Sequence, residues 1–247
     1  MSETIALTYN TLFTPGDVCE VRAILANAGQ SKHYQGWSSG IVSGYFDNAE
    51  DLALWCAPLD AAGICKAIYI TLNPVLPSLL GRANNCLKGL KRGDPTTSDE
   101  EISARNWLMI DLDPIRPAGI SSNQTELDHA HTRAQEVMDT LATEGWPTPV
   151  TALSGNGFHL LYRISYPNDD STATFIKNTL DTLSDQFSDN TVNLDRTVFN
   201  ASRGAKLYGT TARKGDTTPD RPHRQSALIE TLSAGIEAGL ELESSHD

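Results

Sequence analysis

Residues 107–114 read WLMIDLDP, a compact apolar run that ends in two aspartates and a proline. Such a run predicts a buried β-strand. Because side chains alternate between the two faces of a strand, Asp111 and Asp113 are expected on one face and Leu112 on the other. Pro114 then ends the strand, which places the carboxylate pair at a sheet edge that a substrate can reach. Alone, the pair is a weak signal, since acidic pairs at strand ends are often only solvated.

The two carboxylates have chemical consequences if they lie together. Like charges repel unless a cation lies between them, and hard oxygen ligands suit Mg²⁺ or Mn²⁺. Asp195, in the later stretch NLDRTVFNASRGAKLYGT (193–210), can complete a site of three carboxylates, and Arg203 and Lys206 can neutralise a triphosphate. The alternative is a plain ion pair between Asp195 and Arg203. Metal ligands beside phosphate-binding cations are what two-metal phosphoryl or nucleotidyl transfer requires.

Between these two stretches, residues 154–159 read SGNGFH. Two glycines predict a tight turn between strands, and glycine lets a backbone approach a ligand closely. The N–H groups of such a turn can cradle phosphate, and His159 can donate a hydrogen bond to a phosphate oxygen. An ordinary hairpin turn with a buried, satisfied histidine is the alternative, and on this stretch alone it is favoured.

The rest of the chain alternates helical and strand patterns. Helices are predicted at Pro15–Ala28, at Pro77–Lys91, from Thr125 to Gly145 with a capping-box-like pair of Thr125 and Asp128, and at Phe175–Phe187. Strands are predicted at Gly40–Phe46, Lys66–Leu72, Trp107–Ile110, Val150–Leu153 and Phe158–Ile164. We therefore expect an α/β (α+β) fold in which helices pack on mixed sheets.

Composition limits the classes of protein that fit. With 247 residues, 39% of them hydrophobic, the chain can form a large core. It lacks a run long enough to cross a membrane and a signal-peptide pattern, so a cytoplasmic location is expected. The four cysteines form no close pair, which indicates buried thiols rather than a zinc or disulfide framework.

The net charge of -12 argues at first against a nucleic-acid partner. Its distribution matters more, because the segment 203–224 holds six Lys and Arg residues against two acids. From charge alone we expect four of these bases to contact nucleic acid, namely Arg213, Lys214, Arg221 and Arg224. A solvated basic loop is an equally good interpretation.

Taken in order, DLD (111–113), SGNGFH (154–159), Asp195 and RGAK (203–206) resemble the motifs of the archaeo-eukaryotic primase superfamily. The likeness is greatest to the primase-polymerases of plasmids, phages and other mobile elements, which are often fused to a helicase. It extends over residues 35–228.

The resemblance implies a primase-like catalytic core at 1–230, with an N-terminal α/β part at about 1–100 and an RRM-like part at 101–230 that holds the metal site. An acidic, flexible tail is expected at 231–247. Many relatives carry a zinc-binding stem or a helical domain after this core, and neither is evident, so unaided primer initiation is expected to be impaired.

The resemblance also implies a function, that of a template-dependent nucleotidyl transferase releasing pyrophosphate. Its partners would be nucleoside triphosphates, a single-stranded or primed DNA template and a helicase. Asp111, Asp113 and Asp195 would bind two ions of Mg²⁺ or Mn²⁺. The residues implied to bind the nucleotide are Ser154, Gly155, Gly157, His159, Arg203 and Lys206.

Two other functions remain open. A haloacid-dehalogenase-type phosphatase also has a D-x-D at a strand end, but Pro114 directly after the motif is unusual there, and Arg203 and Lys206 have no matching role. A non-catalytic RRM-like module would need exposed aromatic residues on a basic sheet face, which an acidic chain with 7% aromatic residues does not suggest.

Overall fold

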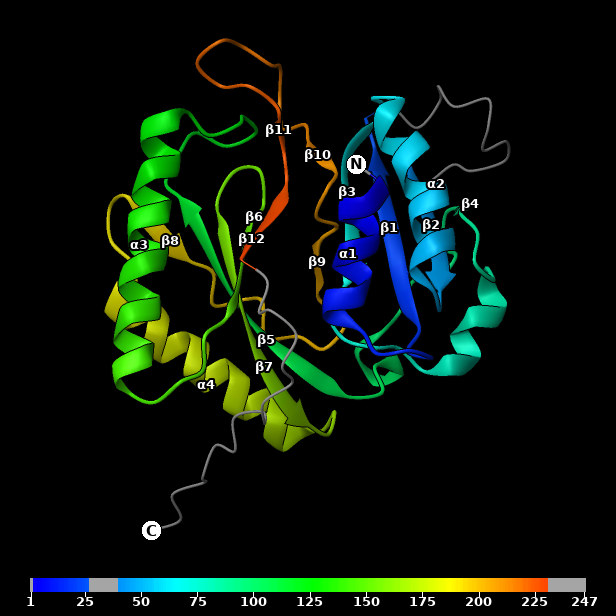
Figure 1. Cartoon of the computed structure of the whole chain (residues 1–247), viewed down its shortest axis with the longest axis horizontal. Coiled ribbons are helices and arrows are strands. Elements are labelled where there is room, and N and C mark those ends of the chain that lie inside the picture. The colour runs from blue at the N-terminus through cyan, green and yellow to red at the C-terminus, as the bar shows by residue number, and fades with distance from the viewer. Residues whose placement is uncertain (1, 27–39, 231–247) are drawn as a thin grey trace.

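The computed structural model describes residues 2–26 and 40–230 of the chain. Two five-stranded sheets, each covered by helices on one face, make up most of this part. The expected α/β fold is confirmed. The sheets are antiparallel rather than mixed, since all pairs of strands described here run antiparallel. In Figure 1 the helices α3 and α4 lie on the left and α1 and α2 on the right, with β9 and β10 between them.

The first sheet is built mainly from the N-terminal half of the chain. In order across the sheet, its strands are β4 (Lys88–Gly89), β2 (Ile41–Phe46), β1 (Cys19–Leu25), β3 (Cys65–Thr71) and β9 (Gly204–Lys206). The helices α1 (Ser2–Leu12) and α2 (Ala49–Ala61) pack on one face of it. Because β9 comes from the C-terminal half, this sheet carries residues from both ends of the described chain.

The second sheet contains the strand with which the sequence analysis began. In order, its strands are β12 (Ala227–Glu230), β6 (Val150–Leu153), β7 (Phe158–Tyr166), β5 (Arg105–Pro114) and β8 (Val192–Leu194). Helices α3 (Gln124–Thr143) and α4 (Asp170–Phe187) contact it. A small ribbon of β10 (Thr211–Ala212) and β11 (Arg224–Gln225) and two short 3₁₀ helices, η1 (Pro77–Arg82) and η2 (Asp99–Glu101), complete the described elements.

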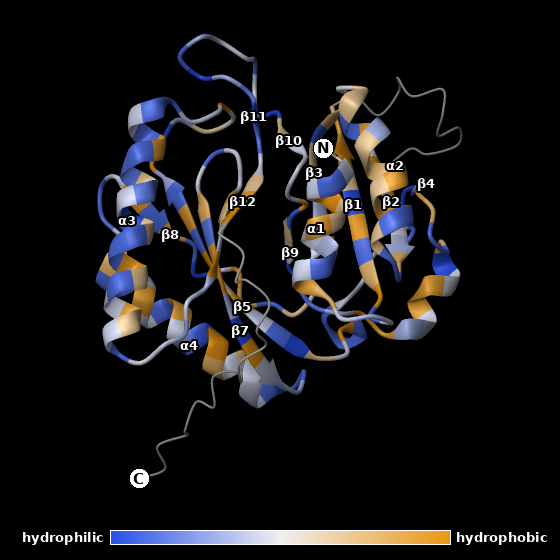
Figure 2. Cartoon of the chain, in the orientation of Figure 1, coloured by the Kyte–Doolittle hydropathy of each residue, from blue (hydrophilic) through white to orange (hydrophobic). Residues whose placement is uncertain are grey.

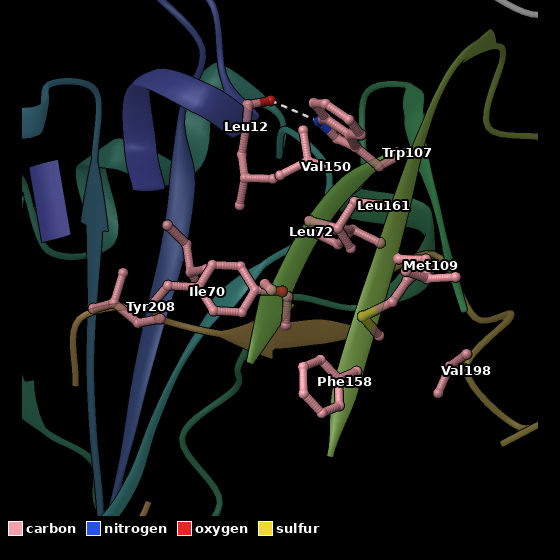
Figure 3. Packing of buried hydrophobic residues seen from close by; sticks show 14 of the residues in the cluster. Leu12, Ile70, Leu72, Trp107, Met109, Val150, Phe158, Leu161, Val198 and Tyr208 are labelled. Carbon is pink, nitrogen blue, oxygen red and sulfur yellow. Dashed lines mark hydrogen bonds between the residues drawn. The ribbon is translucent and has the colours of Figure 1, made fainter. Parts of the chain in front are cut away.

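One continuous core holds the two sheets together. Trp107 at the start of β5 is 5% exposed, and its Nε1 donates to the carbonyl oxygen of Leu12 at the end of α1 over 2.9 Å (Figure 3). Burying a large aromatic side chain in this way contributes roughly 1.5–3 kcal/mol. Figure 2 shows the pattern behind this packing, with β1 mostly hydrophobic and α3 mostly hydrophilic. Within the described chain, no helix combines the length and apolar content needed to cross a bilayer.

The helix predicted at Pro15–Ala28 is wrong, since this segment forms strand β1, and Ala28 lies outside the described residues. From Val21 onward burial alternates, with Val21 and Ala23 fully buried and Arg22 and Ile24 more exposed. Pairing with β2 on one side and β3 on the other overrides the helical spacing of the apolar residues.

The helix predicted at Pro77–Lys91 is also mostly wrong, because only η1 forms and the chain then turns into β4. Asn85 takes a left-handed conformation with φ of 49°. The following backbone lies directly against β2, where a Cβ on Gly44 would come within 2.1 Å of the oxygen of Cys86. That close approach needs an extended chain rather than a helix.

The other predicted helices and strands are confirmed with small shifts. The capping box of α3 is formed by Asn123 and Glu126 rather than by Thr125 and Asp128. Asparagine is as good an N-cap as threonine, and the glutamate three residues on completes the box. Helices α1 and α2 were not predicted from the sequence. In α2 the internal Pro58 is a residue that normally argues against a helix. The predicted tail at 231–247 lies outside the described residues.

Candidate active site

The two aspartates of β5 lie on the face of the second sheet that turns away from α3 and α4. Their side chains are 17% and 46% exposed for Asp111 and Asp113, whereas Leu112 between them is fully buried. The expected alternation is therefore confirmed. The expected sheet edge is wrong, because β5 is an interior strand flanked by β7 and β8. The carboxylates reach solvent because they stand near the end of that strand.

Strand register brings two more of the candidate residues beside Asp111. On one side Asp111 pairs with His159 of β7. On the other, Leu112 pairs with Leu194 of β8, and the backbone N–H of Asp195 donates to the oxygen of Asp111 over 2.9 Å. Directly opposed residues of an antiparallel pair share a face, with Cβ atoms about 4.5–5.5 Å apart. His159, Asp111 and Asp195 therefore form a row across three neighbouring chain segments.

This row lies in a cleft with two lobes. The Asp195 lobe has a volume of about 480 Å³ and is lined, among others, by Arg22, Asp195 and Arg203. The Ser154 lobe has a volume of about 760 Å³ and is lined, among others, by Ser154 and Lys214. Both lobes are lined by Ile24, Tyr69, Asp111, Asp113, His159 and Lys206. The cleft thus joins an acidic group from the second sheet to a buried lysine from the first.

The two neighbouring carboxylates influence each other. Loss of hydration and the charge of Asp111 raise the pKa of Asp113. Burial would also raise the pKa of Asp111, but the charge and hydrogen bond of His159, with help from Arg203 and Arg116, hold it below its usual value. A cation between the two carboxylates would relieve this repulsion, and their oxygens suit a hard divalent ion.

The third carboxylate is engaged elsewhere. Asp195 accepts hydrogen bonds from the N–H and hydroxyl of Thr197 at 2.8 and 2.7 Å, and Arg203 lies 3.2 Å from its other oxygen. In the described part of the chain, no three His, Cys, Asp or Glu side chains are grouped closely enough to hold a metal as they stand. Asp111 and Asp113 supply oxygen ligands of the kind that a hard divalent ion takes, whereas one oxygen of Asp195 is paired with Arg203.

His159 has a buried partner that the sequence analysis missed. The hydroxyl of Tyr208 lies 2.7 Å from Nδ1 of His159, and Nε2 lies 3.5 Å from Asp111. Burial and the charge of Asp111 raise the pKa of Tyr208 well above its usual value, so the phenol keeps its proton. If the phenol donates a hydrogen bond to Nδ1, then Nε2 carries the N–H that lies toward Asp111. Tyr208 lies two residues after Lys206 in the sequence. A spacing of two residues on a strand is the signal that could have placed Tyr208 on the same face as Lys206.

Replacing Tyr208 by phenylalanine is expected to remove this control of the histidine. In the wild type, nitrogen-15 NMR should show His159 as the Nε2–H tautomer, and in Tyr208→Phe as a mixture. The lost hydrogen bond should also lower the free energy of unfolding by about 1 kcal/mol. Tyr9→Phe is a matched control, because Tyr9 is buried and donates to the oxygen of Asp17 over 2.6 Å. A wild-type spectrum of the Nδ1–H tautomer would contradict the assignment.

Lys206 is a buried cation without a carboxylate partner. It is 3% exposed, its Nζ donates to the oxygen of Thr211 over 3.2 Å, and the ammonium lies 5.7 Å from the centre of the Tyr69 ring. Burial lowers the pKa of Lys206 to about 8. No ion pair of this lysine is found among the described residues. A desolvated ammonium in a cleft wall is suited to an anionic ligand.

The glycine turn is required by packing. A Cβ on Gly157 would lie 2.3 Å from the oxygen of Leu112, and one on Gly155, where φ is 101°, would lie 2.6 Å from Cβ of Ala212. Neither glycine lines the cleft, whereas Ser154 and Asn156 do. The turn therefore places two polar side chains at the cleft and keeps β7 close to β5.

Gly157→Ala is expected to destabilise the protein by roughly 1–3 kcal/mol, near the upper end because the obstacle is backbone. Gly81→Ala is the control, since a Cβ there meets nothing within 4 Å, and it should leave stability nearly unchanged. Urea denaturation of the two variants measures the difference. Equal stabilities would show that β5 and β7 are not packed as described.

The basic segment is less free than the sequence suggested. Arg213 forms an ion pair of 2.7 Å with Asp60, and Arg221 one of 2.7 Å with Glu126. Arg224 donates to the oxygen of Ser122 and, with Arg221, lines a separate cavity at the start of α3. Of the four predicted nucleic-acid contacts, the structure places Arg213 and Lys214 in the Ser154 lobe.

Solved structures include domains that are similar in fold to this chain. No family model and no curated protein matches the chain. The AEP domain of a primase-polymerase from cyanophage S-2L is similar with a TM-score of 0.49 and 15% sequence identity, over 93% of this chain and 90% of that one. The polymerase domain of ligase D from Mycobacterium tuberculosis, solved with DNA, is similar with a TM-score of 0.44 and 14% identity, over 91% of this chain and 79% of that one.

Proposed function

We propose that this protein is a metal-dependent nucleotidyl transferase, a primase-polymerase that adds nucleotides to a 3′-hydroxyl on a DNA template and releases pyrophosphate. The observation that carries the proposal is the composition of one cleft. Asp111, Asp113 and Asp195 meet there with the buried ammonium of Lys206 and the guanidinium of Arg203. An acidic group for cations beside a basic group for phosphates is what this reaction class needs.

Asp111 and Asp113 would hold the first divalent ion, Mg²⁺ or Mn²⁺, and Asp195 would complete a site for two. When bound, such ions activate the attacking hydroxyl and neutralise charge on the leaving pyrophosphate. Contacts with Thr197 and Arg203 fix the orientation of the Asp195 side chain. A triphosphate that attracts Arg203 would free one oxygen of Asp195 for the cation, which couples nucleotide binding to completion of the metal site.

The phosphates of the incoming nucleotide would be held by groups around the row of carboxylates. Lys206 supplies a fixed positive charge, Arg203 a planar donor, and His159 the N–H of Nε2. Ser154 in the neighbouring lobe supplies a hydroxyl. Lys206 has no other anionic partner among the described residues, so a phosphate would offset the cost of its burial.

The DNA would approach through the larger Ser154 lobe. Lys66 and Lys214 are exposed there, and Arg213 lines the same wall. Arg221 and Arg224 would contact more distant phosphates at the surface near the start of α3. In this arrangement the catalytic core comprises residues 1–230, with the second sheet carrying the acidic residues and the first sheet carrying Lys206.

Incorporation of labelled nucleotides tests the proposal on three substrates: primed DNA, unprimed single-stranded DNA and no DNA, each with Mg²⁺ and with Mn²⁺. Extension of the primer establishes a polymerase, and products on the unprimed strand establish a primase. If folded protein binds DNA without any synthesis, the RRM-like binding module is the better interpretation, and phosphate release without DNA favours the phosphatase.

A further inference from the structure

A fully buried carboxylate lies behind the lysine of the cleft. Asp60, near the end of α2, is 0% exposed and none of the candidate roles uses it. It accepts hydrogen bonds from the N–H and the hydroxyl of Thr211, both at 3.1 Å. The oxygen of the same Thr211 accepts from Nζ of Lys206 over 3.2 Å. Thr211 thus links the carboxylate to the ammonium by hydrogen bonds to both.

Arg213 completes this arrangement. Its guanidinium donates to Oδ1 of Asp60 at 2.7 Å and to the backbone oxygen of Asp60 at 2.8 Å. A third donation, of 3.3 Å, reaches the oxygen of Cys65 at the start of β3. Asp60 therefore fixes residues 211 and 213 to α2, and Arg213 also fixes this segment to β3.

We infer that Asp60 is a positioning residue for the phosphate-binding ammonium of Lys206. It acts on the ammonium through Thr211, and the partly buried Arg213 is its ion-pair partner. The inference rests on the proposed function, since it assigns Lys206 the role of binding a triphosphate. A lysine has four rotatable side-chain bonds, and fixing its ammonium in advance lowers the entropy lost when a phosphate binds. The buried contacts of Asp60 behind Lys206 are therefore part of the nucleotide site although no ligand reaches them.

The charges around Lys206 support this role. The negative charge of Asp60 favours the ammonium form, whereas Arg213 opposes it. Cys65 also faces the lysine, and Asp111, Asp113 and His159 line the cleft in front of it. Among these groups, Asp60 is the fully buried carboxylate whose charge acts on Lys206. Without it the lysine would face Arg213 alone, and its charged form would be less favourable.

A structural role alone would be different in kind. If the ion pair only ties α2 to the segment 211–213, its removal should change nucleotide affinity by the same factor with any residue at position 206. A positioning role acts through Lys206 and disappears with it. This difference makes a double-mutant cycle the appropriate test.

The test measures the Kd of a nucleoside triphosphate by calorimetry with Ca²⁺, for the whole chain at neutral pH. The first variant is the pair Asp60→Asn with Arg213→Gln, which keeps the shape of both side chains and leaves no unpaired charge. We expect it to weaken binding about tenfold, equivalent to about 1.4 kcal/mol. Lys206→Met should weaken binding by itself, and adding the pair to it should change Kd no further.

A matched control is the double change Arg133→Gln with Asp189→Asn, which removes another ion pair of 2.6 Å between distant parts of the chain, away from the cleft. It should leave Kd unchanged. If the Asp60 pair variant does not fold, Thr211→Val tests the inference instead, because it removes only the hydroxyl contact with Asp60. It should weaken nucleotide binding about threefold when Lys206 is present and have no effect when methionine replaces it. Each threefold step corresponds to about 0.6 kcal/mol.

Two outcomes would overturn the inference. One is unchanged affinity in the pair variant or in Thr211→Val, and the other is an equal loss of affinity with lysine and with methionine at position 206. Failure of the proposed function is distinguishable from both, because the wild-type protein would then bind no nucleoside triphosphate at all.

Discussion

Asp111→Asn is expected to lower the rate of nucleotide incorporation by at least about a thousandfold, equivalent to about 4 kcal/mol of transition-state stabilisation. Asp111 lies between His159 and Asp195 in the row across the sheet and lines both lobes of the cleft. An amide there keeps the shape but removes the charge that holds the divalent ions. Primer extension under single-turnover conditions measures the loss.

The same variant should remain folded. The change gives up favourable contacts of the carboxylate with His159 and nearby arginines, and it relieves the repulsion that raises the pKa of Asp113. These effects oppose each other, so we expect the free energy of unfolding to change by less than about 1 kcal/mol. Asp139→Asn, on the exposed side of α3, is the control for both measurements. A folded Asp111→Asn variant with wild-type activity would show that the carboxylate does not hold the catalytic metal.

Lys206→Met is expected to stabilise the folded protein and to weaken its binding of nucleotide. Burial lowers the pKa of Lys206 from 10.5 to about 8, so the folded protein disfavours the charged form. The cost of that charge is fully present below pH 8 and disappears as the pH rises to 10.5, because the unfolded chain then binds more protons than the folded one. At 1.36 kcal/mol for each pKa unit, the cost at neutral pH is at most about 3 kcal/mol.

Methionine has nearly the same shape without the charge, so Lys206→Met should be more stable than the wild type at pH 7 and should lose most of this advantage by pH 10. Nucleotide binding should weaken by at least about tenfold. Chemical denaturation at the two pH values, compared between variant and wild type, measures the first effect. Arg196→Met, at an exposed arginine whose partners are on α4, controls for the removal of a charge. A variant less stable than the wild type at pH 7 would mean that the ammonium is better satisfied than its contacts suggest.

The strand-based part of the site was predictable from the sequence. Alternation in WLMIDLDP places Asp111 and Asp113 on one face, and the turn at 154–159 places His159 at the start of the strand that pairs with β5. These are local regularities, and a period of two residues needs no knowledge of the rest of the chain. Strand β8 and its pairing with β5, which bring Asp195 beside Asp111, were not predicted from the sequence.

The remaining features depend on contacts between distant segments. Asp60 meets residues 151 and 153 positions away, and no pattern in the sequence signals that pairing. Tyr208 reads as an ordinary core aromatic until β9 is placed next to β3. Strand β1 was mistaken for a helix because its apolar spacing fits both periods, and only the neighbouring strands decide between them.

The central claim is that the cleft transfers a nucleotidyl group with two divalent ions. The most direct test is a single-turnover reaction on primed DNA with Mg²⁺ or Mn²⁺, in which added nucleotide, pyrophosphate and orthophosphate are all quantified. The account predicts one pyrophosphate for each nucleotide added, no orthophosphate, and neither product after chelation of the metal or in Asp111→Asn. Orthophosphate without nucleotide addition, or addition that persists without divalent metal, would contradict it.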